Sequence, residues 1–173
     1  MPPLPQSFAS IDRRVTKWMA DHAIGLTRIA LGVVFFWFGV LKFFPGLSSE
    51  EPIATRTMRA ISFGLLEPAV SRPLLATWEC LIGLGLLSGK ALRATLLLLF
   101  VQMLGTLLPL LLFPQETFTI IPIVPTLQGQ FIIKNLVLMA AAISVGATVR
   151  GGQVIADPGA AHTAKRMENQ RAT

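Results

Sequence analysis

Four long apolar runs stand out along the chain, separated by more polar stretches. They cover residues 24–44, 73–87, 91–113 and 130–149. A helix of about 20 residues spans a hydrocarbon core roughly 30 Å thick, so each run predicts one membrane-spanning helix. The second run is the shortest, and its helix is expected to begin earlier, near Pro68, because proline is favoured in the first turn of a helix. The pattern predicts an all-α integral membrane protein, folded as a bundle of four transmembrane helices.

A different pattern precedes the first run. Phe8, Ile11, Val15 and Trp18 recur at intervals of three and four residues, while charged residues occupy positions between them. Apolar residues at this spacing share one face of a helix, which favours an amphipathic helix lying in the membrane interface. We therefore predict an N-terminal amphipathic interfacial helix within residues 1–22, with Trp18 as an interface anchor. The transmembrane domain then covers residues 23–150. Residues 151–173 are polar and poor in helix signals, which predicts a mobile polar cytoplasmic tail.

Two connections between the spans are long enough to carry structure of their own. The first, residues 45–69, predicts an amphipathic piece near residues 58–66, where it could cover the outer mouth of the bundle. The third, residues 114–129, holds Pro114, Pro122 and Pro125 among isoleucine and valine residues. An apolar loop broken by proline is expected to lie against the bundle or in the interface rather than in water.

Basic residues near the ends of the spans predict the orientation of the bundle. The connection between the third and fourth runs has no lysine or arginine, whereas basic residues flank the other side. By the positive-inside rule, both chain termini are expected in the cytoplasm, and we predict a multi-pass protein of the bacterial cell (inner) membrane. Arg56, Arg59 and Arg72 oppose this orientation, but nearby glutamates partly compensate them. The residues that favour it are Arg13, Arg14, Lys17, Lys90, Arg93 and Arg150.

Composition agrees with this class of protein. Of the 173 residues, 53% are hydrophobic and 14% are charged. The mean hydropathy is +0.63, well above that of an average soluble protein. The formal net charge of +6 is then mainly a topology signal and a source of affinity for anionic lipid, so no nucleic-acid partner is expected.

Charged residues within or at the ends of the apolar runs are the strongest clue to function. The ones that we single out are Arg28, Lys42, Glu79 and Lys134. A charge in the hydrocarbon region costs roughly 2.5–3.5 kcal/mol, so such residues usually face a protein interior, a polar cavity or the lipid head groups. Lys42 and Lys134 lie at the outer ends of their helices and can reach inward, whereas the short side chain of Glu79 cannot reach the head groups. We predict that Lys42, Glu79 and Lys134 form one buried polar cluster.

Two neighbours extend this candidate ligand-binding cluster. Arg72 lies at the same end of the bundle, and Asn135 follows Lys134. The cluster then carries surplus positive charge, which we expect a carboxylate, a lipid phosphate or an acidic ligand to compensate. Structural alternatives remain open, with Arg28 as an interface anchor that reaches the head groups and Glu79 as one half of a salt bridge to a lysine.

The first helix also predicts how the bundle packs. Two glycines on one of its faces allow a neighbouring helix to approach closely, and Gly83 on the second helix offers the same. Trp37 is expected in the core, Cys80 in inert packing and Gln102 in a hydrogen bond between helices. The residues that share the packing face of the first helix are Arg28, Gly32, Phe35, Gly39 and Lys42.

The sequence argues against a resident cofactor. Cys80 is the only cysteine, and His22 and His162 lie outside the spans. Thiol exchange, a cysteine-ligated iron–sulfur cluster and a bis-histidine haem therefore lack ligands. There is no dinucleotide-binding or phosphate-loop motif. We expect no intrinsic cofactor and no catalytic activity of the chain's own, and only a quinone or a lipid as a bound molecule.

Three parts of the sequence together resemble the DoxX-like family of small four-helix membrane proteins. They are residues 28–32 with 36–43 (RIALG and FWFGVLKF), Glu79 with Gly83, and residues 127–138 (LQGQFIIKNLVL). Members of this family are associated with oxidoreductase systems and include small subunits of quinone-linked enzymes, so the resemblance implies redox-associated work in a membrane. Relatives favour an acidic residue where this chain has Gln128, so the resemblance implies no acidic group at that position.

Two functions remain open. The first is a non-catalytic accessory subunit of a larger redox or energy-transducing membrane complex, with membrane lipids and other membrane subunits or a second copy of the chain as partners. The alternative is a quinone- or anionic-ligand-binding component of a membrane oxidoreductase, in which Glu79 and the lysines hold the head group of the ligand. Transport of an ion or solute has little support beyond the polar cluster.

Overall fold

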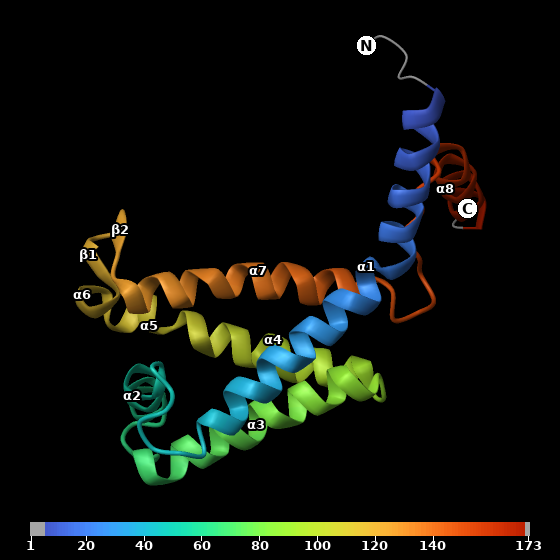
Figure 1. Ribbon diagram of the computed structural model, residues 1–173. Helices are drawn as coiled ribbons and strands as arrows, with labels where there is room; N and C mark the ends of the chain where they lie inside the picture. The colour runs from blue at the N-terminus through green and yellow to red at the C-terminus, as the bar shows by residue number, and fades with distance from the viewer. Residues whose placement is uncertain (1–5, 172–173) are drawn as a thin grey trace.

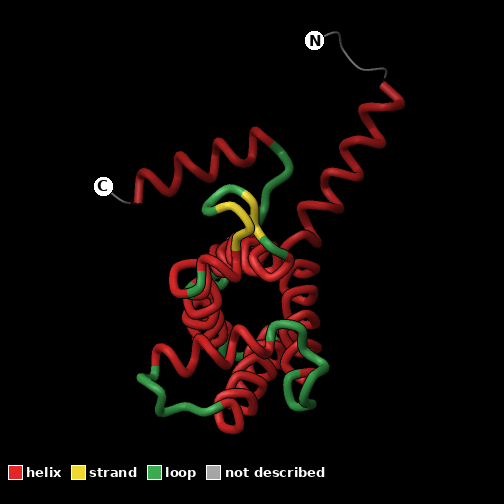
Figure 2. The backbone as a smooth tube through the Cα atoms, turned by 90° about the vertical axis from the view of Figure 1, so that its left-hand side faces the viewer, coloured by secondary structure: helices red, strands yellow, loops and turns green. Residues whose placement is uncertain are grey.

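The computed structural model describes residues 6–171, which include four helices long and apolar enough to cross a membrane. The first is Ser10–Leu41, within α1 (Gln6–Leu41), and the second is α3 (Pro68–Ser88). The third, Leu92–Leu112, contains α4 (Leu92–Leu107) and α5 (Pro109–Leu112), and the fourth is α7 (Leu127–Ala147). Figure 1 shows the spans gathered into one bundle, and Figure 2 shows the bundle almost end-on. The predicted four-helix membrane bundle is confirmed, as is the start of the second span at Pro68.

Helices α1 and α3 form the most extensive contact in the fold, and glycines bring them together. A Cβ atom added at Gly83 would lie 2.5 Å from the backbone nitrogen of Phe36, and one at Gly39 would lie 2.8 Å from that of Cys80. These distances leave no room for a side chain, so the two backbones pack against each other directly. The packing face predicted from the sequence is therefore the one that the fold uses.

The hydrophobic core fills the half of the bundle nearer the chain termini, because its residues come from the ends of the spans that lie there. Trp37, predicted in the core, is instead 65% exposed. It lies about 200° around α1 from the buried Phe35 and so faces away from the bundle. The core residues are Leu31, Phe35, Ile82, Leu86, Leu96, Leu99, Met103, Ala142 and Val145.

A short amphipathic helix, α2 (Glu51–Ile61), lies across the other end of the bundle (Figure 1). Its existence was predicted, but it begins and ends earlier than residues 58–66. Pro52 occupies its first turn, a favoured position for proline. Phe63 and Gly64 have φ angles of 54° and 86°, and this left-handed turn ends the helical path. Ile53, Thr55 and Thr57 are buried, and Ile53 and Thr57 lie on the side that faces the cavity of the bundle.

The connection between the third and fourth spans folds into α6 (Pro114–Thr117) and a small antiparallel hairpin, β1 (Phe118–Ile120) and β2 (Val124–Pro125). Thr117 is fully buried at its base, where α6 packs against α7. The tip, with Ile120 and Ile123, is exposed and projects from the bundle (Figure 1). The predicted contact with the bundle holds for the base of the loop only.

The N-terminal segment is not the separate interfacial helix that its pattern predicted. α1 is continuous from Gln6 to Leu41 and apolar as a whole. Its 36 residues correspond to about 54 Å, longer than the hydrocarbon core. Figure 1 shows its N-terminal part bending away from the bundle. No proline interrupts residues 6–41, so the two predicted segments join into one helix. The prediction also covered residues 1–5 and the side chain of Phe8, which lie outside the described part of the structure.

The C-terminal segment, predicted to be poor in helix, contains α8 (Pro158–Arg171). Asp157 Oδ1 accepts hydrogen bonds from the backbone N–H groups of Gly159 and Ala160, at 2.7 and 3.4 Å. An aspartate before the first turn and a proline at its first position are strong start signals for a helix. The polar composition of the segment concealed these signals.

Candidate functional site

A buried ion pair joins the first two spans in the half of the bundle away from the chain termini. Lys42 Nζ donates hydrogen bonds to both carboxylate oxygens of Glu79, at 2.8 Å to Oε1 and 2.6 Å to Oε2. Gln102 Nε2, from α4, donates to Glu79 Oε1 at 2.9 Å. All three side chains are buried. The carboxylate within the span therefore has a cationic partner and a neutral donor, as a charge in this environment requires. The predicted role of Gln102 between helices is confirmed.

The local sequence explains why these groups meet. Gly39 lies one turn before Lys42, and a Cβ atom added there would lie 3.0 Å from Glu79 Cβ. Because Gly39 has no side chain, α1 approaches α3 closely enough for the lysine to reach the carboxylate. Cys80 follows Glu79 and lies against α1, with its Sγ 4.0 Å from the carbonyl oxygen of Phe36.

A second carboxylate approaches the same ammonium group. Glu50, directly before α2, places its Oε2 3.7 Å from Lys42 Nζ and is partly exposed. The cluster thus holds one ammonium and two carboxylate groups. Of the compensating groups expected from the sequence, a carboxylate is the one that the structure shows, and the chain itself supplies it. Sequence reasoning missed Glu50, which lies in a connection outside the apolar runs. Its position at the start of an amphipathic segment was the available signal.

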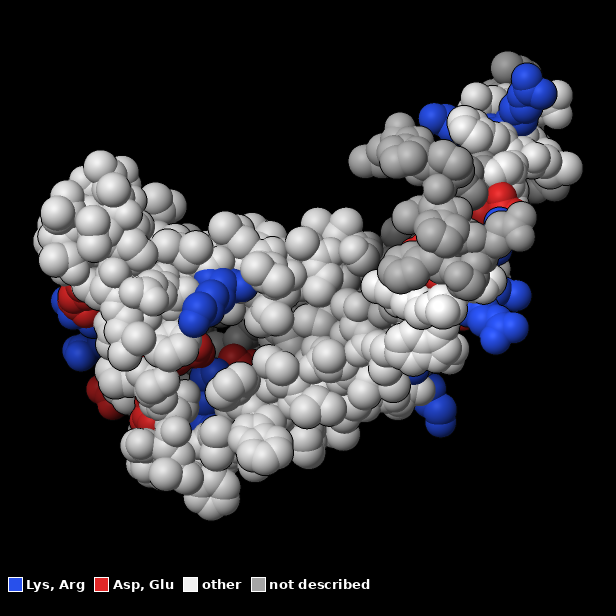
Figure 3. Space-filling view, turned by 45° about the horizontal axis from the view of Figure 1, so that its top comes forward, with Lys and Arg blue, Asp and Glu red and all other residues white. Residues whose placement is uncertain are grey.

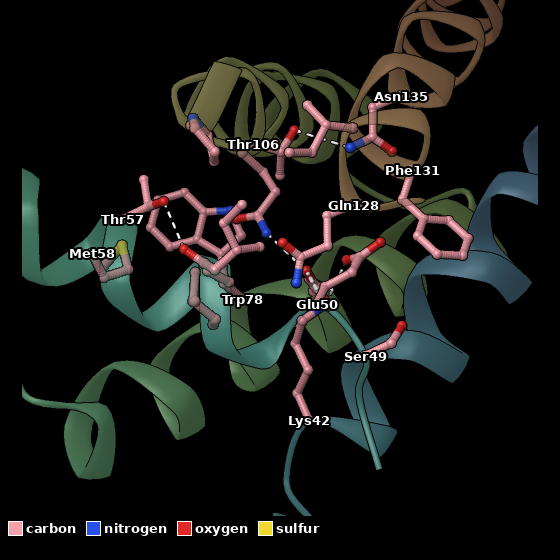
Figure 4. Close-up of a pocket in the computed structure, with 18 of the residues that line it drawn as sticks. Lys42, Ser49, Glu50, Thr57, Met58, Trp78, Thr106, Gln128, Phe131 and Asn135 are labelled. Carbon is pink, nitrogen blue, oxygen red and sulfur yellow. Dashed lines mark hydrogen bonds and ion pairs between the residues drawn. The ribbon is translucent and has the colours of Figure 1, made fainter. Parts of the chain in front are cut away.

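The ion pair lies at the wall of a cavity of about 430 Å³ between α2, α3, α4 and α7. The walls are mostly apolar, with Ile53, Trp78 and Phe131 among them. Asn135 Nδ2 donates to Thr106 Oγ1 at 3.3 Å on one side of the cavity (Figure 4). Figure 3 shows a hollow on one face of the bundle with acidic and basic side chains gathered around it. The neutral polar residues that line the cavity include Ser49, Thr57, Gln102, Thr106, Gln128 and Asn135.

Lys134 is not part of the cluster, contrary to the prediction. Its side chain is exposed, and its Nζ lies 5.3 Å from the centre of the Phe131 ring. Successive residues of a helix point about 100° apart. Because Asn135 faces the cavity, its neighbour Lys134 points away from it. Arg72 also lies outside the cluster, where its Nη1 is 3.2 Å from Glu51 Oε1. Of the predicted cluster, Lys42, Glu79 and Asn135 line the cavity.

The two predicted interface anchors lie far from the cavity. Arg28 is half-buried, and its Nη1 donates to the carbonyl oxygen of Leu86 at 3.1 Å. A cation at this end of α3 also interacts favourably with the helix dipole, so Arg28 ties the two helices together. Trp18 is exposed, and its ring stacks on that of His22 with centroids 4.9 Å apart.

Charged contacts hold α2 over the cavity. Glu51 accepts a hydrogen bond from the backbone N–H of Gly46 at 3.0 Å and one from Arg72 at 3.2 Å. The Gly46 hydrogen bond, with a smaller contribution from Arg72, holds the pKa of Glu51 below its ordinary value, against the opposing effect of burial. Arg56 of α2 forms an ion pair with Glu116 and lies over the Phe113 ring. The helix is thus fixed to elements on both sides.

Comparison with protein families gives a match to the DoxX family over residues 23–113, more than half of the chain. The chain belongs to the DoxX family. The matched range includes Lys42, Glu50, Glu79 and Gln102, whose side chains form the ion pair and its surroundings. α7, with Asn135, lies beyond the matched residues. Comparisons with curated proteins and with solved structures gave no match.

Proposed function

We propose that this DoxX-family membrane protein binds an amphiphilic small molecule, a quinone or a lipid, in the cavity between α2, α3, α4 and α7. The observation that carries the proposal is the cavity itself. Its volume of about 430 Å³ falls within the range of roughly 300–1,000 Å³ typical of ligand sites. Ligand sites also share its composition, with apolar walls and a few polar groups that fix the orientation of the ligand.

The lining offers different contacts to the two parts of an amphiphile. Thr106, Gln128 and Asn135 can exchange hydrogen bonds with a head group, while Trp78 and Phe131 offer apolar surface to a chain or ring. In this proposal the chain binds and orients the molecule, and we expect no reaction catalysed by its own side chains. Any redox chemistry belongs to the ligand or to a partner.

Gly105 allows a clean test of this function. It lines the cavity, and a Cβ atom added there meets no atom within 4 Å. Gly105→Leu places its Cβ atom in open space and should therefore fill part of the cavity. Replacing a glycine within a helix by a better helix former gains roughly 0.5–1 kcal/mol, so the variant should fold at least as well as the unmodified protein.

The measurement is mass spectrometry of small molecules that co-purify with the protein from membranes in mild detergent. We expect a stoichiometric amphiphile with the unmodified protein and its loss from Gly105→Leu. Gly25→Leu is the matched control, because Gly25 also has open space around it but lies on α1 away from the cavity. Equal recovery of the molecule from the Gly105 and Gly25 variants would show that the cavity is not its site.

A second candidate, an accessory subunit of a larger membrane complex, is favoured by the N-terminal part of α1. This part projects from the bundle (Figure 1) and exposes Ile11, Val15, Trp18 and Met19. An apolar surface of this kind is suited to contact with another subunit, a second copy of the chain or the lipid surface. If a partner binds here, Ile11→Gln/Val15→Gln should lose it on purification, while Gly105→Leu should retain it. Retention of all partners by the double variant would rule out this surface as the contact.

For localisation we propose the bacterial inner membrane with both termini in the cytoplasm. The support is the distribution of basic residues, together with an even number of spans, which brings both termini to one end of the bundle (Figure 1). The cavity and α2 would then lie toward the outer side of the membrane.

A further inference from the structure

We infer that the cavity selects an amphiphile with a cationic head group, an alkylammonium, over amphiphiles with a neutral or anionic one. The inference rests on the proposed function, because it assumes that an amphiphile occupies the cavity. Of the two ligand classes proposed there it selects a lipid amine over a quinone, whose head group is neutral. It differs from the sequence analysis, in which an acidic ligand was one of the open alternatives.

The charges that line the cavity carry the argument. Among the lining residues that the structure describes, the charged ones are Lys42, Glu50 and Glu79. One ammonium and two carboxylates leave a net charge of −1. A cationic head group would bring the site to neutrality, whereas an anionic one would raise the charge to −2 within apolar walls. Because like charges repel strongly where water is scarce, the second arrangement is disfavoured.

The exposure of the three charged side chains also favours a cationic head group. The side chains of Lys42 and Glu79 are 5% and 8% exposed, and Lys42 Nζ lies 2.6 Å from Glu79 Oε2. The side chain of Glu50 is 45% exposed. A head group that enters the cavity therefore meets the carboxylate of Glu50 first. The ammonium of Lys42 is already held between two carboxylates and offers no separate site for an anion.

The other basic groups of this region do not change the sign of the net charge that lines the cavity. Arg72 pairs with Glu51, and Arg56 pairs with Glu116. Lys134 Nζ lies over the Phe131 ring, 5.3 Å from its centre, and Lys134 is not among the residues that line the cavity. The two arginines are each balanced by a carboxylate, and Lys134 lies outside the lining, so the residues that line the cavity keep their acidic net charge.

The experiment uses Trp78 as a reporter, because it lines the cavity. The chain has three tryptophans, and the other two, Trp18 and Trp37, are exposed on α1. In the Trp18→Phe/Trp37→Phe protein the fluorescence comes from Trp78 alone. Full-length protein in neutral detergent is titrated with three probes of equal chain length, ω-bromoundecylamine, ω-bromoundecanol and ω-bromoundecanoate, whose bromine quenches a nearby indole.

We expect saturable quenching at the lowest concentration with the amine and at the highest with the carboxylate. Glu50→Gln should weaken binding of the amine about three- to tenfold, as for an ion pair at a half-exposed site, and should change binding of the alcohol by a smaller factor. Glu67→Gln is the control, since it removes an exposed carboxylate that does not line the cavity. The comparison of the three probes on one protein requires no substitution at the site itself.

Two failures are distinguishable. If the alcohol or the carboxylate binds as tightly as the amine, the inference about charge is wrong while the ligand-binding function stands. If no probe gives saturable quenching of Trp78, the cavity does not hold an amphiphile and the proposed function fails with the inference.

Discussion

We expect substitution of Lys42 to lower the free energy of unfolding strongly. In Lys42→Met the buried carboxylate of Glu79 keeps only the amide of Gln102 as a polar partner among the described contacts. Removing one member of a buried ion pair costs about 3–5 kcal/mol, because the remaining charge stays desolvated and uncompensated. We expect a loss of this size in the free energy of unfolding.

Substitution of the partner, Glu79, should lower the free energy of unfolding by less, because Lys42 keeps a contact with Glu50. In Glu79→Gln the ammonium of Lys42 still has the carboxylate of Glu50, at 3.7 Å, and can donate to the new amide oxygen. The expected loss is about 1–3 kcal/mol, the range for a weakened hydrogen bond to a charged group. The double variant Lys42→Met/Glu79→Gln contains neither charge of the pair and should be more stable than the sum of the single losses implies.

The assay is equilibrium unfolding of each variant by titration with a denaturing detergent in mixed micelles. Lys134→Met is the matched control, because it removes the same charge from an exposed position, and its effect should stay within about 0.5 kcal/mol. Strictly additive losses in the Lys42/Glu79 double variant would refute the pairing. A loss for Lys134→Met as large as that for Lys42→Met would refute the distinction between the two lysines.

Three further predictions follow from packing, titration and topology. Gly83→Ala should destabilise the bundle by at least about 1–3 kcal/mol in the same titration, since the new methyl group meets the backbone of α1; an unchanged midpoint would contradict this close contact. The hydrogen bond from the backbone N–H of Gly46 lowers the pKa of Glu51. The stabilisation of α2 by the Glu51 carboxylate is therefore fully present above the ordinary glutamate pKa and is lost as the pH falls through the lowered pKa. The protection of α2 against hydrogen exchange, measured relative to the intrinsic exchange rate at each pH, should therefore fall at acidic pH in the unmodified protein, and Glu51→Gln should lose this dependence; identical pH profiles of protection would exclude the mechanism. Reporter fusions after α7 should read as cytoplasmic and fusions before β1 as external, and the opposite readings would overturn the proposed orientation.

The sequence by itself determined the class of protein and the depth of its charges. Length and hydropathy predict the four spans, and position along a helix follows directly from the rise per residue. From depth alone it follows that Glu79 needs a partner within the protein, because its side chain is too short to reach the head groups. The glycines of the first two spans likewise identify the faces that meet, since a face without side chains is the one that permits close approach.

The tertiary structure decided which groups meet around those faces. Lys42 and Lys134 have the same chemistry and were both predicted in the cluster, yet only Lys42 contacts Glu79. The difference is the rotation of each helix about its axis, and rotation is fixed by packing against neighbours rather than by the sequence of one helix. Glu50 reaches the pair because α2 folds back over the bundle, and the cavity exists because four separate elements leave space between them. Contacts between distant segments depend on how all of them pack at once, which no local pattern encodes.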